Sequence, residues 1–492
     1  MKSVETLIIG AGPAGLTAAY TLARAGRSVA VIERDPVYVG GISRTVVYKG
    51  YRFDIGGHRF FSKSAEIEAL WSELLGDELM QRPRSSRIYY NGKLFDYPLR
   101  AMDALSKLGP IEAVRSVFSY AKAQVSPFKP VKNYEEWVVN NFGRRLFEIF
   151  FKTYTEKVWG MDCKDISADW AAQRIKGLNL FQAIVSSFGL KSGGKDKIIK
   201  TLIDAYRYPK LGPGAMWEKA RDRILDMGGD VRMGATIDAL SQDGAGRWQV
   251  AVADSLGRIE MYSAQHVIST TSISELIDLL GARVPADVRQ QAAGLRYRDF
   301  LIVGLIMKGQ EKFADNWVYI HDPKVKVGRI QNFKSWSPFM VPDPSTACYG
   351  LEYFCFEGDG VWSKTDASLI ALATKEIDTL GLASADSIID GTVIRQRKAY
   401  PVYDDGYQGR VDAIRTGLDA VFSNLHFAGR NGMHKYNNQD HAMMTGLLTA
   451  RNIIAGKPVW NVWAINQDAE YHESGEAGAE VLEERLVPRR VA

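Results

Sequence analysis

Three glycines near the start of the chain stand at the spacing that phosphate-binding turns require. In GAGPAG these are Gly10, Gly12 and Gly15, between an apolar run and a helical pattern. They allow a tight turn, a close approach of backbone to pyrophosphate and close helix-strand packing. Glu33 ends the next apolar run, where its carboxylate can accept a hydrogen bond from a ribose hydroxyl. This order of strand, turn, helix, strand and acid predicts a dinucleotide site.

Two glycine pairs follow this motif, each accompanied by a basic side chain. In VGGISR, residues 39–44, Gly41 lets the backbone pass close to a ligand, and Arg44 brings a cation toward its phosphates. In FDIGGHRFF, residues 53–61, the second pair is followed by His58. A site for NAD does not by itself require these pairs, so they bear on which dinucleotide binds.

With these motifs the chain resembles the FAD-binding superfamily that contains amine oxidases, protoporphyrinogen oxidase and UDP-galactopyranose mutase. The resemblance implies FAD, with Gly56, Gly57 and His58 against the isoalloxazine and Ile237 near the adenine. His58 can also be a core histidine, and its functional role is to orient backbone near flavin N5 rather than to carry a proton. The cofactor-binding residues that the resemblance implies are Gly10, Gly12, Gly15, Glu33, Arg34, Gly41, Ser43, Arg44, Gly56, Gly57, His58, Ile237, Gly429, Arg430, Asp440, His441 and Ala442.

The run FEIFFKTYTEKVWG, residues 147–160, carries aromatic residues that could face a substrate. Phe150, Tyr154 and Trp159 form a stripe at helical spacing, which is usually a core feature. However, YTEKVWG resembles the nucleotide-contacting helix of UDP-galactopyranose mutases. Arg174 stands fifteen residues after Trp159, where mutases of the eukaryotic type have an arginine on the substrate diphosphate. The forked guanidinium group of arginine matches the geometry of phosphate oxygens.

Further matches to the mutases extend over roughly residues 4–455. Tyr97, in YNGKLFDYPLRA, falls where a tyrosine lies near the uridine, and Tyr400, in RKAYPVYDDGY, where one binds the diphosphate. The run HKYNNQDHAM resembles the mutases' KY and NQDH segment, which implies Tyr436 as a second diphosphate tyrosine and Asn438 as a substrate-side amide.

The chain also departs from the mutase pattern near the expected nucleotide. Thr155 replaces a base-reading asparagine of the eukaryotic type, and Arg100 replaces a glutamine near the uridine, so recognition of uracil itself is in doubt. The second diphosphate arginine falls near Lys308, although Arg298 fits the arginine of the bacterial type. A lysine keeps the charge but loses the bidentate geometry.

The resemblance implies a flavin-dependent nucleotide-sugar mutase. Such an enzyme interconverts the pyranose and furanose forms of a UDP-galactose-like hexose through an adduct between the sugar and N5 of reduced FAD. The alternative is an FAD oxidoreductase of the amine oxidase, protoporphyrinogen oxidase or desaturase kind, which the same flavin motifs serve. The reductant is left open between NADPH and NADH. The implied catalytic residues are Arg174, His58, Tyr400, Tyr436 and Asn438, and the implied substrate-binding residues are Tyr97, Phe150, Tyr154, Trp159, Arg298 and Lys308.

The candidate residues are spread along the whole chain. To bring them together, the fold needs a sheet built from segments that are far apart in the sequence. Thr6 to Ile9 and Ser28 to Glu33 read as strands around a helix from Pro13 to Ala25, the opening of a βαβ unit. We expect an α/β fold with a Rossmann-like FAD-binding domain, an inserted helical region and a second, antiparallel-sheet substrate domain. The expected segments are 1–95, 206–285 and 406–465 for FAD binding, 96–205 for the helical nucleotide-binding insertion, 286–405 for the antiparallel sheet and 466–492 for a flexible tail.

Composition excludes several classes of protein. The 492 residues have a net charge of only +5, too small and too scattered to indicate a nucleic-acid partner. No apolar run is long enough to span a membrane, and the start lacks a signal peptide, so we expect a cytoplasmic protein. Cys163, Cys348 and Cys355 lack metal-binding spacing and read as reduced structural thiols. No metal site is predicted, and a homo-oligomer is left open.

Overall fold

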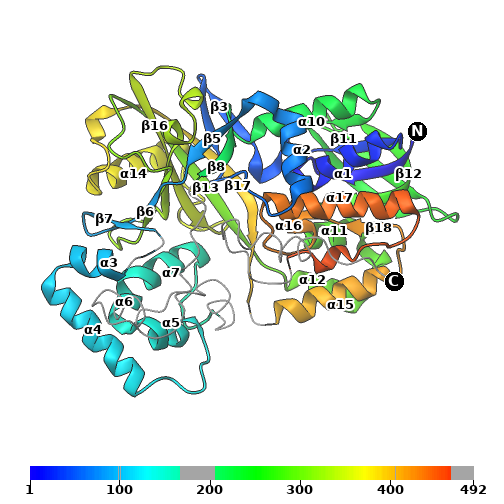
Figure 1. Ribbon diagram of the computed structural model, residues 1–492. Coiled ribbons are helices and arrows are strands. Elements are labelled where there is room, and N and C mark those ends of the chain that lie inside the picture. Colours follow the sequence, from blue (N-terminus) through cyan, green and yellow to red (C-terminus); the bar gives the residue numbers. More distant parts are fainter. Residues whose placement is uncertain (98, 100, 167–204, 405, 467–492) are drawn as a thin grey trace.

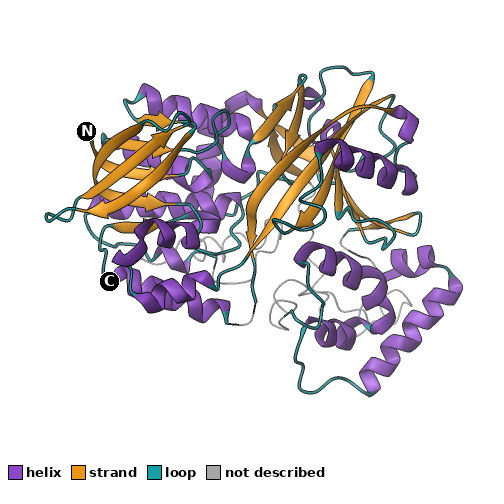
Figure 2. Ribbon diagram, turned by 180° about the vertical axis from the view of Figure 1, so that it is seen from behind, coloured by secondary structure: helices purple, strands orange, loops and turns teal. Residues whose placement is uncertain are grey.

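The computed structural model describes most of the chain. Residues 98, 100, 167–204, 405 and 467–492 are not described, so Arg174, Arg100, the glycine- and lysine-rich segment 191–197 and the C-terminal tail lie outside the described residues. Two large sheets lie side by side, and a helical region lies beneath the second of them (Figures 1 and 2). This is the α/β fold with a Rossmann-like part and a second sheet that the sequence predicts.

The first sheet has seven strands and is built around β1 (Lys2–Ile9). β1 pairs in parallel with β2 (Val29–Ile32) on one side and with β12 (Ile259–Ser269) on the other. Residues 6–9 of β1 are all buried, because helices cover both faces of the parallel part of the sheet. The remaining strands are β9 (Asp230–Arg232), β10 (Ala235–Gln242), β11 (Trp248–Asp254) and β18 (Leu425–Phe427).

Two groups of helices cover this sheet and share its hydrophobic core. The first group packs around α1 (Pro13–Arg24) and α17 (Gln439–Ala455), which lie so close that a methyl group at Gly446 would be 2.1 Å from the carbonyl oxygen of Ala14. The first group also contains α2 (Ala65–Leu75) and α10 (Gly214–Asp226), and the second contains α11 (Ile273–Leu280), α12 (Ala286–Ala293) and α15 (Tyr407–Asp419).

The second sheet also has seven strands and is mostly antiparallel. Its order is β17-β13-β16-β15-β14-β6-β7, and β14 with β6 is its parallel pair. β6 and most of β7 come from the segment 1–95 that we expected in the FAD-binding domain, but β6 pairs with β14 and β7 pairs with β6, so both belong to the second sheet. The bounds are β6 (Ser86–Tyr90), β7 (Lys93–Asp96), β13 (Tyr297–Lys308), β14 (Trp317–Ile320), β15 (Arg329–Asn332), β16 (Thr346–Cys355) and β17 (Ile388–Pro401), with α14 (Asp366–Thr379) packed against β13 and β17.

The helical region has a core of its own beneath the second sheet (Figure 1). A π-helical turn at Glu148–Lys152 joins its last two described helices, and such turns often occur at functional sites. The helices are α3 (Ala101–Leu108), α4 (Pro110–Val125), α5 (Tyr134–Phe142), α6 (Arg144–Phe147) and α7 (Thr153–Trp159). Two small sheets complete the fold: β3 (Thr45–Tyr48) with β4 (Tyr51–Asp54), and β5 (Leu79–Pro83) with β8 (Ala205–Pro209).

Three expectations from the sequence concern cysteines, membrane spans and metal sites. Cys163, Cys348 and Cys355 are buried and form no disulfide. Within the described residues, no helix combines the length and the apolar content needed to cross a bilayer. The same residues contain no cluster of three or more His, Cys, Asp or Glu side chains placed to hold a metal ion.

Candidate functional site

The turn after β1 is shaped by close packing. Gly10 has a φ of +98°, a conformation that favours glycine, and a methyl group added at Gly15 would lie 2.0 Å from its carbonyl oxygen. At Gly12 the nearest atom to such a methyl group is the Cα of Gly41, 3.9 Å away. The turn therefore needs Gly15 for packing, while Gly12 leaves open space beside it that phosphates can enter.

Glu33 follows β2 beside this turn, and its carboxylate is largely buried. One carboxylate oxygen accepts a hydrogen bond from the N–H of Ala11 at 2.7 Å, and the other accepts one from the N–H of Asp35 at 2.9 Å. Each oxygen has a second lone pair. Glu33 thus fixes the turn and keeps acceptor capacity for a ribose hydroxyl.

A cavity of about 880 Å³ lies beside this turn, and we call it the cofactor groove. It brings together residues from β1, β2, β10, the segment after β2 and the start of α17. Open space beside the glycine turn, a buried acceptor and nearby guanidinium groups fit FAD, because its pyrophosphate needs cations and donors and its riboses need acceptors. The predicted cofactor residues that line the groove are Gly10, Gly12, Glu33, Arg34, Gly41, Ser43, Arg44, His58, Ile237, Gly429, Arg430 and Ala442.

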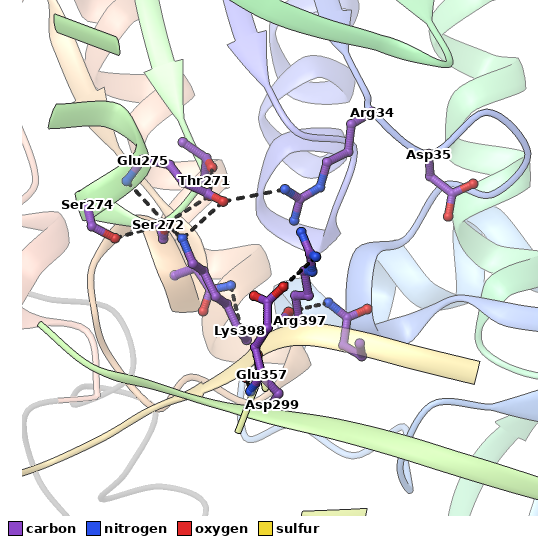
Figure 3. Close-up of polar contacts among 12 residues, drawn as sticks. Arg34, Asp35, Thr271, Ser272, Ser274, Glu275, Asp299, Glu357, Arg397 and Lys398 are labelled. Atoms are coloured by element: carbon purple, nitrogen blue, oxygen red, sulfur yellow. Dashed lines mark hydrogen bonds and ion pairs between the residues drawn. The ribbon is translucent and has the colours of Figure 1, made fainter. Parts of the chain in front are cut away.

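A polar cluster ties the second sheet to the wall of the cofactor groove (Figure 3). Lys398, on β17, donates to Ser272 and pairs with Glu275 on α11, each at 3.0 Å. Burial raises the pKa of Glu275, but hydrogen bonds from Thr271 and the charge of Lys398 bring it down to about 2. Arg34 lies 3.5 Å from the same carboxylate. The cluster therefore holds β17 and α11 together across the groove.

A second cavity, of about 180 Å³, shares its boundary with the cofactor groove, and we call it the arginine cavity. Its lining includes four arginines and three tyrosines, which come from the second sheet, from strand β8 of a small sheet, from the short helix after β18 and from loops. The residues that line both cavities are Ile42, His58, Arg430, Asn438 and Gln439. Other residues lining the arginine cavity are Gly56, Gly57, Arg59, Arg84, Tyr206, Trp317, Arg329, Tyr400, Tyr436 and Asp440.

Trp317, on β14, packs between the second glycine pair and an arginine. A methyl group at Gly57 would lie 2.1 Å from the indole ring, so this position must be glycine. The guanidinium of Arg59 lies 4.2 Å from the centre of the same ring, and it donates to Ser86 at 3.1 Å. Arg59 was not singled out from the sequence, although it follows His58 in the motif FDIGGHRFF, and neither was Arg84, which stands in no matched motif.

Arg329, on β15, is paired with a buried acid. Its Nε donates to Glu352 on β16, whose other oxygen accepts from Gln331 at 2.8 Å. Burial by itself lowers the pKa of Arg329, but the neighbouring carboxylate holds the pKa well above the ordinary arginine value. Arg329 therefore brings a permanent positive charge to the arginine cavity. Arg329 was not singled out from the sequence.

Tyr400 and Tyr436 form a parallel pair at the junction of the two cavities. Their ring centres are 5.5 Å apart and their planes differ by 13°. The guanidinium of Arg430 lies 5.1 and 5.2 Å from the two ring centres and donates to the carbonyls of Ala399 and Asn437, each at 3.0 Å. Burial raises the pKa of Tyr400, so its hydroxyl stays protonated and can donate.

His58 lies at the same junction. Its Nε2 is 2.9 Å from the carbonyl of Ile55 and 3.0 Å from that of Ile42, so this nitrogen must carry the proton. Burial lowers the pKa of His58 to about 4. The imidazole is therefore neutral, and it holds two backbone segments together instead of exchanging a proton.

Helix α17 begins at this junction with several groups directed toward the cavities. Asn438 is the N-cap of this helix. The backbone N–H of Asn438 lies 3.4 Å from Nδ1 of His441, so the buried imidazole takes part in capping the helix. Asp440 accepts from Ser62 at 2.9 Å. Gln439 is only 8% exposed, and neither polar atom of its side chain finds a hydrogen-bond partner in the described structure. An unpartnered amide beside two cavities indicates a missing ligand.

An aromatic layer lies between the helical region and the second sheet. Tyr154, on α7, stacks on His321 with ring centres 4.9 Å apart and planes 3° apart. It also meets Tyr319 edge-on at 5.4 Å, and Tyr97 lies 4.6 Å from Tyr319. Tyr97 and Tyr154 are thus brought to one layer, as their proposed nucleotide contact requires.

The other two aromatic residues of the run 147–160 lie in the core. Phe150 is 3% exposed and Trp159 8% exposed, and both pack within the helical region. Thr155 is buried, and its hydroxyl donates to Tyr134 at 3.1 Å. The hydroxyl of Thr155 is therefore engaged within the helical region.

The structure separates Arg298 and Lys308 from the arginine cavity. Arg298 begins β13 but donates to the carbonyls of Lys157, Val158 and Phe354, so its guanidinium holds the end of α7. Lys308 is exposed at the other end of the same strand, roughly 33 Å away at the usual strand rise. Neither side chain lines the arginine cavity, and the cation that β15 brings to it is Arg329. Contact of Arg298 or Lys308 with a substrate stays a prediction.

Comparisons with known proteins agree with this geometry. Residues 8–74 match the family described as "NAD(P)-binding Rossmann-like domain". The chain is 28% identical over 177 residues to a probable UDP-galactopyranose mutase of Klebsiella pneumoniae, covering 34% of this chain and 44% of that one. It is 44% identical over 87 residues to a putrescine oxidase of Kocuria rosea, or 18% of each chain. The chain is homologous to both kinds of enzyme.

These sequence matches span less than half the length of either relative. The fold extends much further than they do. A crystal structure of reduced UDP-galactopyranose mutase superposes with a TM-score of 0.77 over 92% of this chain and 94% of that chain, at 20% identity. This similarity establishes the shared fold, and the chemistry must be inferred from the site.

Proposed function

We propose that this protein is an FAD-dependent mutase that interconverts the pyranose and furanose forms of a nucleotide-linked hexose. One observation carries the proposal: a cavity lined by four arginines opens onto the cofactor groove at His58. The homologous mutase and oxidase support a flavoenzyme in general. The charge of the arginine cavity favours the mutase, because a nucleotide sugar carries a diphosphate.

The donors in the arginine cavity suit a diphosphate better than an uncharged group. Arg329 stays positive, and the hydroxyl of Tyr400 stays protonated. The hydroxyl of Tyr206, the indole N–H of Trp317 and the amide of Gln439 are buried, and none finds a hydrogen-bond partner within the described residues. Phosphate oxygens can accept from all of these groups. An apolar substrate would leave them without partners.

The protein would hold the nucleotide sugar so that its anomeric carbon meets the cofactor. When bound, reduced FAD supplies a nucleophilic nitrogen that breaks and remakes the anomeric bond without net redox change. Arg329, Tyr400 and Tyr436 would retain the departing diphosphate close enough to return. His58 would hold the backbone of the second glycine pair against the flavin. Arg174, outside the described residues, remains our prediction for a further diphosphate ligand.

The nucleotide base would lie at the aromatic layer. Tyr97 and Tyr154 offer ring faces there, and burial keeps the pKa of Tyr154 well above its ordinary value, so that it remains a neutral surface for stacking. The hydroxyl of Thr155 is already engaged by Tyr134. We therefore propose that base recognition differs from that of the eukaryotic-type mutases.

The second candidate is an FAD oxidoreductase acting on an amine. The parallel pair of Tyr400 and Tyr436, together with the homologous putrescine oxidase, favours it. However, the guanidinium of Arg430 already lies against both rings, and three more arginines line the cavity. A protonated amine would be repelled by these charges. The mutase is therefore the first choice.

Turnover by reduced protein tests the proposal. The FAD-loaded protein would be reduced with dithionite under argon and supplied in turn with UDP-galactopyranose and other nucleotide hexoses. We expect chromatography to reveal the furanose isomer with reduced flavin, and none with oxidised flavin. Flavin bleaching by an amine, with peroxide formed on return to air, would instead support the oxidoreductase.

A further inference from the structure

Exposed apolar side chains gather on one part of the helical region. Eight of the twenty large apolar residues that are exposed in the described chain fall between residues 102 and 131. Monomeric proteins rarely expose apolar side chains so close together without a binding role. The eight residues are Met102, Ile111, Val114, Val117, Phe118, Val125, Phe128 and Val131.

Four of these residues form a stripe along α4. Ile111, Val114, Phe118 and Val125 are 69%, 55%, 72% and 87% exposed, and their spacing of three, four and seven places them on one face. The opposite face, with Ser116 and Ala123 buried, packs toward α5 and α6. α4 lies at the periphery of the helical region in both views (Figures 1 and 2). The stripe is therefore directed away from the protein.

Basic residues accompany the stripe. Lys122 is on α4, and Lys129 and Lys132 alternate with Phe128 and Val131 in the segment that follows. All three lysines are exposed, and none forms an ion pair with a residue that the structure describes. Apolar residues flanked by lysines are typical of surfaces that bind anionic membranes.

We propose that α4 and the segment 126–132 bind the surface of an anionic lipid bilayer. Phe118, Val125 and Phe128 would enter the boundary between headgroups and acyl chains, while the lysines would pair with lipid phosphates. A second copy of the chain fits the face less well, because a two-fold contact would set the unpaired lysines of one copy against those of the other. The inference does not depend on the mutase proposal.

Vesicle sedimentation with the full FAD-loaded chain tests the inference. Wild-type protein is expected to sediment with vesicles of equal parts phosphatidylcholine and phosphatidylglycerol, and much less with phosphatidylcholine alone. Phe118→Glu/Val125→Glu should reduce the partition coefficient about tenfold or more. Leu256→Glu, at another site that is 75% exposed, is the matched control and should bind as wild type. Raised salt should weaken binding to the anionic vesicles.

Charge reversal provides a second variant at the same face. Lys122→Glu/Lys129→Glu should lower binding to anionic vesicles at least about fivefold for each lysine, because each reversal removes a positive charge and adds a negative one, with no effect on the flavin spectrum. Failure of the wild type to sediment with the anionic vesicles would overturn the proposal. So would a dimer in sedimentation velocity that Phe118→Glu/Val125→Glu dissociates, because the face would then be covered by a second copy.

Discussion

The glycine turn and the arginine cavity are both suited to phosphate groups, but they are built in different ways. The turn uses the backbone of a single short segment, in which a methyl group added at Gly15 would lie 2.0 Å from the carbonyl oxygen of Gly10. The arginine cavity uses side-chain charges from segments far apart in the chain, including Arg59, Arg329 and Arg430.

This difference decides what each region tolerates. The fold requires the packing at the turn. A substitution that disrupts the turn should therefore also destabilise the folded protein. The arginine cavity is held by β15 and β16, whose strands have other buried contacts, so individual charges can be removed while FAD stays bound. Because the turn is one contiguous segment, it can be recognised in the sequence. The arginine cavity cannot, since its residues come from distant segments.

The largest effect is expected at the turn. Gly15→Val should remove roughly 3 kcal/mol or more of unfolding free energy, because the side chain must displace α1 from the turn. Urea unfolding and flavin absorbance after purification would measure both losses. Gly244→Ala is the control, since a methyl group there meets nothing within 4 Å. If Gly15→Val kept normal stability and FAD, the packing explanation of the turn would be wrong.

Removal of one cation should impair the arginine cavity and leave the glycine turn intact. Arg329→Met is expected to weaken nucleotide-sugar binding roughly ten- to hundredfold while FAD stays bound. Because this change leaves Glu352 buried without its partner, Arg329→Met/Glu352→Gln distinguishes lost binding from lost stability. Lys308→Met, on the exposed end of β13, is the control. Calorimetric titration that found Lys308 more important than Arg329 would contradict the assignment of Arg329 to the substrate diphosphate.

Acid should weaken the loop that carries Tyr436. Burial lowers the pKa of His434, in this loop, to about 4 from 6.5, so the unfolded chain binds its proton first as pH falls. The contribution of His434 to the free energy of unfolding is complete above pH 6.5 and is lost toward pH 4. The loss is about 2 kcal/mol between pH 7 and pH 5. His434→Asn tolerates the φ of +45° at this position and should flatten the dependence. Parallel wild-type and variant curves would contradict this assignment.

The smallest effect is expected from single hydroxyl groups. Tyr400→Phe or Tyr436→Phe should each lower affinity for the nucleotide sugar about fivefold, the usual consequence of losing one hydrogen bond. Because the rings still stack and still support Arg430, the flavin spectrum should not change. A loss of FAD in either variant would assign the tyrosine pair to the cofactor groove instead.

The sequence predicted the local parts of the site better than the assembled parts. The strand, glycine turn, helix and Glu33 were predicted because they adjoin in the chain and packing fixes each residue type. Arg329 was passed over, because only strand pairing reveals which strands lie beside the cavity. Lys308, which the resemblance implied, does not line it. Trp159 and Phe150 were expected at the substrate, but a helical stripe does not say which of its members the core will take.

Gln439 illustrates the same limit within a matched motif. The run that contains it was identified from Tyr436 and Asn438, yet the glutamine was not chosen. Its importance depends on burial without a hydrogen-bond partner beside both cavities, which only the folded chain reveals.

The central claim is that the arginine cavity binds a diphosphate beside the flavin. Calorimetric titration of the FAD-loaded protein with UDP, dTDP, ADP and GDP, each compared with its nucleoside, tests it most directly. We predict that at least one nucleoside diphosphate binds about a hundredfold more tightly than its nucleoside and perturbs the flavin spectrum, because the arginines recognise the phosphates. Equal affinity for every nucleoside and its diphosphate, or no binding of any diphosphate, would contradict the account.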